Sequence, residues 1–187
     1  MAPGKAAASK PNSMYTAILI PIGFLALGVL AVLLLKRIVN HDAAKVSRAA
    51  SAITDFELPA GYAPEFTASL MGYAVAAFNR GDGHSHLYLI QSTKGSDAAK
   101  LFRWLARLAP GSKGSFTDIT VTEHRAATIR GQEVTLIVGK GIDREGRSCR
   151  QLTATFRGKG GPALLVLSEP TTHWNQYSID AFIASIR

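Results

Sequence analysis

The sequence has very little cysteine and a low proportion of charge. Only one cysteine, Cys149, occurs among 187 residues, so the chain cannot form an internal disulfide or a zinc site made of cysteines alone. Charged residues make up 18% and hydrophobic residues 47%, which excludes an intrinsically disordered chain. No internal repeat is present either, which excludes collagen-like and solenoid proteins.

Familiar catalytic motifs are also missing. The sequence contains no GxSxG elbow and no HExxH helix. Its two glycine-lysine segments do not match a P-loop, because Gly139-Lys140 is followed by Gly141 and not by Ser or Thr. We expect both segments, GKGIDREG and GKGG, to be turns between strands. The sequence therefore predicts a protein that is not an enzyme and has no cofactor.

The positive charge is concentrated at the N-terminal end. Twenty-one Lys and Arg residues face 13 Asp and Glu residues, a net charge of +8. Residues 1–50 carry six basic residues and one acidic residue (6 − 1 = +5), and residues 51–187 carry fifteen and twelve (15 − 12 = +3). Because most of the excess lies outside the larger part of the chain, we do not expect nucleic-acid binding.

A long apolar segment explains that charge distribution. Residues 15–35 contain no charged side chain and, as a helix, would extend about 31 Å, the thickness of a hydrocarbon core. A cleaved signal peptide has a shorter apolar region, and this one ends in Lys36-Arg37. We therefore predict an N-terminal tail (1–14), a single transmembrane helix (15–35) in contact with the lipid bilayer, and a membrane location.

The basic residues around the span leave its orientation open. Lys36, Arg37, Lys45 and Arg48 follow the span and outnumber the basic residues before it, which favours a cytoplasmic domain. A short basic tail before an uncleaved apolar helix is also typical of signal-anchored, exported domains. Residues 36–54 keep a helical pattern, with Val39, Val46 and Ile53 seven residues apart, and predict a helical juxtamembrane linker.

Residues 55–187 have the pattern of one soluble α+β domain. Two β-prone runs, 68–78 and 86–91, flank the Gly81-Asp82-Gly83 turn and indicate a hairpin. A helix is expected to start at Ser96 and end before Pro110. Strands then recur to residue 168, with a hairpin at Gly131-Gln132, and a final helix follows. The order predicts a mostly antiparallel sheet packed with two helices.

Several segments resemble a group of uncharacterised bacterial single-pass membrane proteins. They are LPAGY at the domain entry, RGQEVTL in the hairpin, the strand FRGKGGPALLVL and the closing DAFIASIR. The layout from residue 56 onward is also similar to PsbP-like domains, which are α/β/α sandwiches found in exported or anchored proteins. The resemblance implies a binding or accessory domain on the extracytoplasmic side, and it assigns no catalytic residue.

The sequence offers a few candidate sites. Asp82, His84 and His86 could hold a metal, because residues two apart on a strand point to the same face. Cys149, with arginines nearby, could be a reactive thiol, although a buried strand residue is the simpler expectation. A basic surface for phospholipid headgroups or an acidic partner could form from Arg144, Arg147, Arg150, Arg157 and Lys159.

These observations predict a membrane-anchored, non-enzymatic domain that binds a protein partner, a lipid or another small apolar ligand. The alternatives are a metal-binding protein or metal-dependent enzyme centred on Asp82, His84 and His86, and a structural subunit of a membrane complex.

Overall fold

The computed structural model describes residues 39–70, 72–92, 119–143 and 145–187. These residues belong to one compact unit, Ile38–Arg187. The predicted tail and transmembrane segment lie outside the described residues, as does the helix predicted between Ser96 and Pro110. None of the helices that the structure describes has the length and apolar character needed to cross a membrane.

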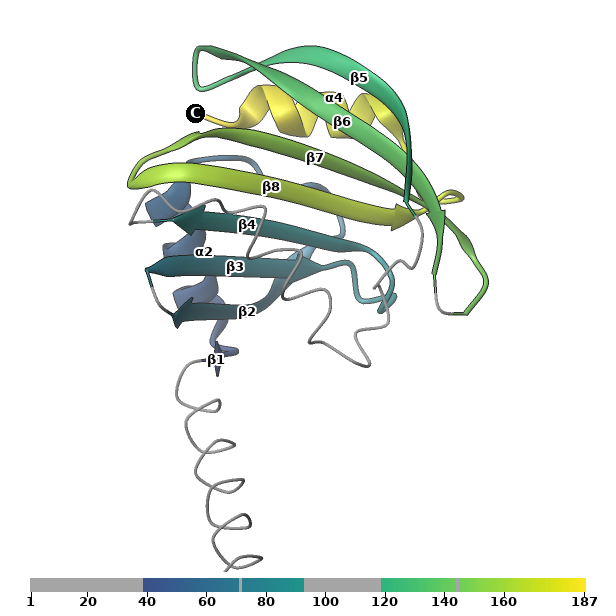
Figure 1. Cartoon of the computed structure of the whole chain (residues 1–187). Helices are drawn as coiled ribbons and strands as arrows, with labels where there is room; N and C mark the ends of the chain where they lie inside the picture. Colours follow the sequence, from purple (N-terminus) through teal and green to yellow (C-terminus); the bar gives the residue numbers. More distant parts are fainter. Residues whose placement is uncertain (1–38, 71, 93–118, 144) are drawn as a thin grey trace, which may run out of the picture. The chain divides into compact units, whose positions relative to one another are not determined.

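A single antiparallel sheet of eight strands forms the body of the unit (Figure 1). Its strand order is β1-β2-β3-β4-β8-β7-β6-β5, so β8 joins an N-terminal and a C-terminal set of strands. The strands are β1 (Val39–Asn40), β2 (Ala63–Leu70), β3 (Tyr73–Asn79), β4 (His86–Ser92), β5 (Thr120–Ile129), β6 (Gln132–Ile142), β7 (Ser148–Gly158) and β8 (Gly161–Pro170).

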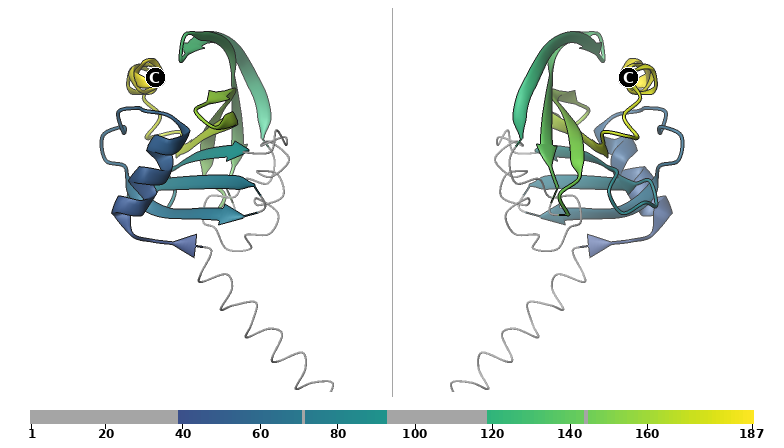
Figure 2. Two further views of the ribbon diagram at one scale, coloured as in Figure 1. Left: turned by 90° about the vertical axis from the view of Figure 1, so that its left-hand side faces the viewer. Right: turned by 90° about the vertical axis from the view of Figure 1, so that its right-hand side faces the viewer.

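Two helices, α2 (Ala43–Ile53) and α4 (Gln176–Ser185), pack on the same face of this sheet. Figure 2 shows both helices on one side, with β5 and β6 curving over α4. Each helix starts at a side chain that accepts hydrogen bonds from free N–H groups of its first turn: Asp42 for α2 and Asn175 for α4. The predicted α+β class with a mostly antiparallel sheet is confirmed, and the predicted final helix corresponds to α4. The other helix, α2, lies in the segment that was predicted to be a linker.

The helix α2 belongs to the core of the domain and is not a linker. Val46, Ala50 and Ile53 are each at most 1% exposed and pack with the sheet. Of the three residues with seven-residue spacing, Val46 and Ile53 lie on α2 and face the chain's own sheet, whereas Val39 lies in β1. Strand β1 also pairs with β2. The boundary predicted at residue 55 is wrong, since the compact unit starts at Ile38.

The turns explain where the strand predictions held and where they failed. Arg130 and Gly131 have φ of 53° and 73°, the two positive values that a tight hairpin turn needs, so the predicted hairpin between β5 and β6 is confirmed. The run 68–78, predicted as one strand, is divided between β2 and β3. Gly72, with φ of 82°, lies at the turn between them.

The glycine-lysine segments lie in hairpins, as predicted. GKGG connects β7 to β8, and Lys159 Nζ donates to Ser51 O at 2.9 Å and pairs with Asp55 at 2.7 Å. Asp55 also exchanges two backbone hydrogen bonds with Arg187. The contacts of Asp55 with Lys159 and Arg187, which we call the clasp, thus join the end of α2, the β7–β8 turn and the residues after α4.

If α2 is part of the core, shortening a buried side chain on it will destabilise the whole unit. We expect Ile53→Ala to lower the free energy of unfolding by about 2–5 kcal/mol, because the change removes buried methyl groups and leaves a cavity. Urea unfolding of the full chain in lipid nanodiscs measures this. The control, Ser47→Ala on the exposed face of α2, should change little. Equal effects of the two variants would contradict the assignment.

Candidate functional site

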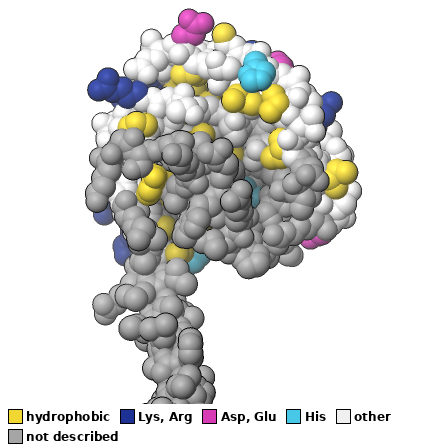
Figure 3. Space-filling model, viewed as in Figure 1, with side chains coloured by type: hydrophobic (Ala, Val, Ile, Leu, Met, Phe, Trp, Pro, Cys, Tyr) yellow, Lys and Arg dark blue, Asp and Glu magenta, His cyan; other side chains and the backbone are white. Residues whose placement is uncertain are grey.

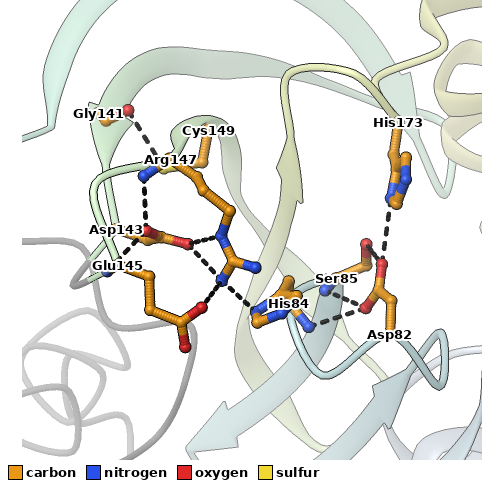
Figure 4. Close-up of polar contacts among 9 residues, drawn as sticks. All are labelled: Asp82, His84, Ser85, Gly141, Asp143, Glu145, Arg147, Cys149 and His173. Atoms are coloured by element: carbon orange, nitrogen blue, oxygen red, sulfur yellow. Dashed lines mark hydrogen bonds and ion pairs between the residues drawn. The ribbon is translucent and has the colours of Figure 1, made fainter.

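Three connections meet at one end of the sheet and bring together most of the candidate polar residues (Figure 4). They are the β3–β4 loop, the β6–β7 turn and the segment between β8 and α4. Asp82 organises the first of these: its carboxylate accepts from the backbone N–H of His84 and Ser85 at 2.8 and 2.7 Å and from Ser85 Oγ at 2.6 Å. Its second oxygen also lies 3.1 Å from His173 Nδ1.

Asp82 is held in its ionised form by these contacts. Burial raises the pKa of Asp82, but the hydrogen bonds from Ser85, His84 and His173 outweigh it and hold the pKa well below its usual range. Nearly all the accepting capacity of the carboxylate is used inside its own loop. These contacts hold the β3–β4 loop in one conformation, and we call them the Asp82 brace.

Arg147 forms the second polar cluster. Its guanidinium pairs with Asp143 at 2.7 Å and with Glu145 at 2.9 Å, and it also contacts His84 Nδ1. Because a guanidinium only donates, His84 Nδ1 must accept in this contact. Burial raises the pKa of Asp143, but hydrogen bonds from Arg147 and Glu145 bring it below its usual range.

The predicted metal ligands are not brought together as a ligand set. Strand β4 starts at His86, so His84 lies in the loop, where its Nδ1 is occupied by Arg147. Asp82 is engaged by its own loop, and His86 faces Glu65 instead. Within the described ranges, no group of three or more His, Cys, Asp or Glu side chains is placed to hold a metal ion.

Cys149 is a buried strand residue. Its side chain donates to Gly141 O at 3.2 Å and is 4% exposed. Burial, together with the charge of Asp143, raises the pKa of Cys149 to about 11. The thiolate needed for nucleophilic attack is therefore disfavoured at neutral pH.

The predicted basic surface is not one surface. Arg147 and Lys159 flank opposite ends of the 11-residue strand β7, about 40 Å apart for an extended strand, and each is paired with carboxylates. Arg150 stacks over the ring of Trp174 at 4.4 Å. Arg157 is exposed, and its backbone carbonyl accepts a hydrogen bond from Arg130 Nη1. Arg144 lies outside the described residues.

Of the membrane-flanking basic residues, Lys45 and Arg48 are described. Both are exposed, three residues apart on α2, and so lie on neighbouring turns of its outer face. Lys36 and Arg37 fall outside the described ranges.

A different polar group, which the sequence did not indicate, lies on the sheet face opposite the helices. His86 and Ser168 are directly opposite each other on β4 and β8, so their side chains share a face. Glu65, at a bulge in β2, reaches towards His86, with 3.6 Å between Oε2 and Nδ1. We call Glu65, His86 and Ser168 the acceptor trio.

Two members of the trio are buried but not satisfied, and the third, Glu65, is half-buried with a side chain that is 30% exposed. His86 is 7% exposed and Ser168 2% exposed. Both ring nitrogens of His86, Ser168 Oγ and Glu65 Oε2 have no hydrogen-bond partner. Leaving one buried polar group unpaired costs about 1–3 kcal/mol, so three such residues on one face are an unusual concentration.

The trio adjoins an apolar area on the same face. Its members come from β3, β4 and β8, and two half-buried aromatic rings pack against it. The area is a buried cluster of Val75, Ile90, Leu164 and Val166, each at most 6% exposed, with Phe66 and Tyr88 beside them. The ring of His86 stacks with Tyr88 at a centroid separation of 5.9 Å, so the polar and apolar parts are continuous.

The charge of the trio is set by Glu65. The neighbouring imidazole of His86 lowers the pKa of Glu65, and burial, which raises it, only partly offsets this effect. The carboxylate is therefore ionised at neutral pH. At 3.6 Å its contact with His86 is longer than a hydrogen bond, which leaves Oε2 able to accept one.

The opposite, helix-bearing face contains a separate polar cluster that is internally paired. Tyr62 donates to Glu169 Oε1 at 2.8 Å, and Arg80 lies 3.7 Å from the same oxygen. Burial raises the pKa of Glu169. Arg80 is thus committed to a carboxylate on the helix side of the sheet.

The remaining features are shallow or isolated. Two open depressions of about 580 and 680 Å³ lie near the β5–β6 turn and along β6–β8, away from the trio. Exposed apolar side chains on the face without helices include Ile119, Val121 and Ile137. Figure 3 looks onto this face and shows several separate hydrophobic side chains on it.

Comparison with known proteins adds no family assignment. No protein-family model matches the sequence, and no curated protein shows significant similarity to it.

The Asp82 brace makes a pH-dependent prediction. Since its pKa is lower in the folded state, the ionised carboxylate stabilises the fold above its unfolded pKa of about 3.9, and this stabilisation is lost as the pH falls towards the folded value. We expect Asp82→Asn to lower the free energy of unfolding by about 1.5–3 kcal/mol at pH 7.

The difference between wild type and Asp82→Asn should narrow below about pH 4, as measured by urea unfolding between pH 7 and 3. Glu133→Gln, at an exposed position, is the control and should change little. A difference that stays constant over this range would show that the charge of Asp82 is not the stabilising factor.

Proposed function

We propose that this chain is a membrane-anchored, ligand-binding domain whose binding surface is the sheet face opposite α2 and α4. The ligand is a small molecule with an apolar body, held against Val75, Ile90, Leu164 and Val166, and a polar end that reaches the acceptor trio. The observation that carries the proposal is the group of buried atoms on Glu65, His86 and Ser168 that lack hydrogen-bond partners.

The physical argument is one of compensation. A fold gains nothing from burying unpaired polar atoms, and an apolar side chain at the same position would be at least as stable. Elsewhere the carboxylates and guanidinium of Asp82, Asp143 and Arg147 are paired repeatedly. The unpaired atoms of the trio do not stabilise the fold, but they would form hydrogen bonds to a bound ligand.

A hydrolase built on Glu65, His86 and Ser168 has less support. The order of the three residues across the strands is that of an acid, a base and a nucleophile. Activation of the serine, however, requires a hydrogen bond between the hydroxyl and the imidazole. Neither Ser168 Oγ nor either nitrogen of His86 makes one. We therefore favour binding over catalysis.

The anchor is a further part of the proposal. Residues 15–35 are proposed to cross the membrane, and the outer side is favoured for the domain by the resemblance to PsbP-like proteins. Three residues, 36–38, separate the end of this segment from β1.

The binding face can be tested through Ser168. Because its hydroxyl is buried and unpaired, we expect Ser168→Ala to raise the free energy of unfolding by about 1 kcal/mol, measured by urea unfolding of the full chain in nanodiscs. The same variant should bind benzyl alcohol several-fold more weakly, as followed by the methyl NMR signals of Val166 and Ile90. Leu165 and Leu87, on the helix side, are internal controls.

The matched variant is Ser185→Ala. Ser185 Oγ donates to Phe182 O at 2.7 Å and accepts from Glu57 N at 3.0 Å, so its removal should destabilise the fold by about 1 kcal/mol. Destabilisation of similar size by both variants would mean that Ser168 has a structural role. Benzyl alcohol that shifts none of the Val166 and Ile90 signals would argue against this binding face.

The side of the membrane can be tested with a reporter cysteine. Cys149 is buried and should not react, so Glu133→Cys, at an exposed position, provides a single accessible thiol. We expect a membrane-impermeant maleimide to label this variant in intact cells before lysis. Wild type, which retains Cys149, is the control. Labelling only after lysis would place the domain in the cytoplasm.

A further inference from the structure

The two edges of the sheet differ greatly in length and exposure. β1, at one edge, has only two residues, whereas β5, at the other edge, has ten, of which seven are exposed (Figure 1). A long exposed edge strand presents free N–H and C=O groups that can pair with a further strand. Proline and lysine commonly block such edges, and the sequence of β5, TVTEHRAATI, contains neither. The β5 edge is therefore able to accept another strand.

The β5–β6 hairpin determines which backbone groups of β5 are free. Its two-residue turn, Arg130-Gly131, closes on Ile129 and Gln132, and the closing pair of such a turn exchanges hydrogen bonds. Every second residue before Ile129 also directs its N–H and C=O groups to β6. The backbone groups of Ala126 and His124 therefore point away from β6, and within the described ranges they make no hydrogen bond on that side.

Two opposite charges lie on one face of this edge. Glu123 and Arg125 are paired with Val138 and Leu136, which belong to the core under the helices, so both charges are on the helix-bearing face. Arg125 is held in place by hydrogen bonds to both carboxylate oxygens of Asp180, and a guanidinium has further N–H donors. Glu123 is exposed and has no ion-pair partner among the described residues.

These charges make β5 complementary to a second copy of itself. In an antiparallel pair of β5 strands centred on His124, Glu123 of each copy lies directly opposite the partner's Arg125. The outward backbone groups of His124 then meet those of the partner's His124. A centre one residue away, at 123 or 125, would place two glutamates or two arginines opposite each other. The charges thus favour one register of a symmetric pair.

We infer that β5 is the dimerisation edge of this protein. Two copies pair antiparallel over residues 122–126, centred on His124, with two Glu123–Arg125 ion pairs on the helix-bearing face. The bulge between Val121 and Glu123 ends the regular ladder at residue 122. The two eight-stranded sheets become one continuous sheet. Strands β6 and β7 separate this edge from β8, so the inference does not depend on the proposed ligand-binding face.

Disulfide formation by the full chain in liposomes tests the register. His124→Cys places two thiols at the centre of the pair, at a Cα–Cα separation of about 5.5 Å, which a disulfide can span. The matched control is Ala126→Cys, on the same edge and face, whose thiol would lie about 13 Å along the strand from its equivalent in the partner. We expect copper-phenanthroline to cross-link the first variant about tenfold or more faster. Wild type, with its buried Cys149, is the blank.

The same assay tests the charge pairing. Adding Glu123→Arg to His124→Cys places arginines opposite each other and should slow cross-linking by about tenfold or more. Adding Glu133→Arg instead makes the same change at an exposed position of β6 and should alter the rate less than about threefold. Labelling with a monofunctional maleimide checks that the thiol is equally accessible in each variant.

Three results would overturn the inference. Equal cross-linking of His124→Cys and Ala126→Cys would contradict the register, and equal effects of Glu123→Arg and Glu133→Arg would contradict the charge pairing. If neither cysteine variant is cross-linked, a second copy does not occupy this edge, and a strand of another protein becomes the alternative. The methyl signals of Val166 and Ile90 test the proposed binding face separately.

Discussion

The central position of β8 is the constraint on which the rest of the domain depends. This strand pairs antiparallel with β4 on one side and with β7 on the other, and it is buried over seven consecutive residues. Its alternate side chains face opposite sides of the sheet. Leu165 and Leu167 therefore join the core under the helices, while Val166 and Ser168 face the other way. A one-residue shift in register would exchange the two sets.

The polar residues divide into two kinds according to how fully they are paired. At the loop end, Asp82 and Arg147 each make several contacts within or between neighbouring turns, and these hold the loops in place. On the sheet face opposite the helices, Glu65, His86 and Ser168 carry buried atoms without a hydrogen-bond partner. The first kind accounts for rigidity, and the second kind supports our assignment of the binding face.

Local patterns predicted the parts of the fold that depend on neighbours in sequence. The α+β class, the β5–β6 hairpin and the role of GKGG as a turn all followed from turn residues and alternation, although the hairpin turn lies at Arg130-Gly131, one residue before the predicted Gly131-Gln132. The packing of α2 could not be predicted in this way, because Val46 and Ile53 fit a coiled-coil stalk equally well. Only contact with distant strands distinguishes the two.

Contacts between residues that are distant in sequence also explain which residues of the site the sequence indicated and which it did not. Asp82, His84 and His86 attracted attention because they are close in sequence, yet their partners lie at Ser85, Arg147 and Glu65. The acceptor trio spans about a hundred residues of sequence. The alternation in HLYLIQS places His86 on the face of Tyr88 and Ile90, which was the one available signal. Nothing in the sequence indicated that Ser168 would lie opposite His86.

The clasp between Asp55 and Arg187 has a consequence for how the domain assembles during synthesis. These residues are 132 positions apart (187 − 55) and exchange two backbone hydrogen bonds. The end of α2 is therefore held only after every strand of the sheet has left the ribosome, although α2 is among the first elements made. Contacts this distant in sequence slow folding. Until they form, the C-terminal end of α2 lacks its two hydrogen bonds to the last residue of the domain, although β2, β3 and β4 can already cover its apolar side.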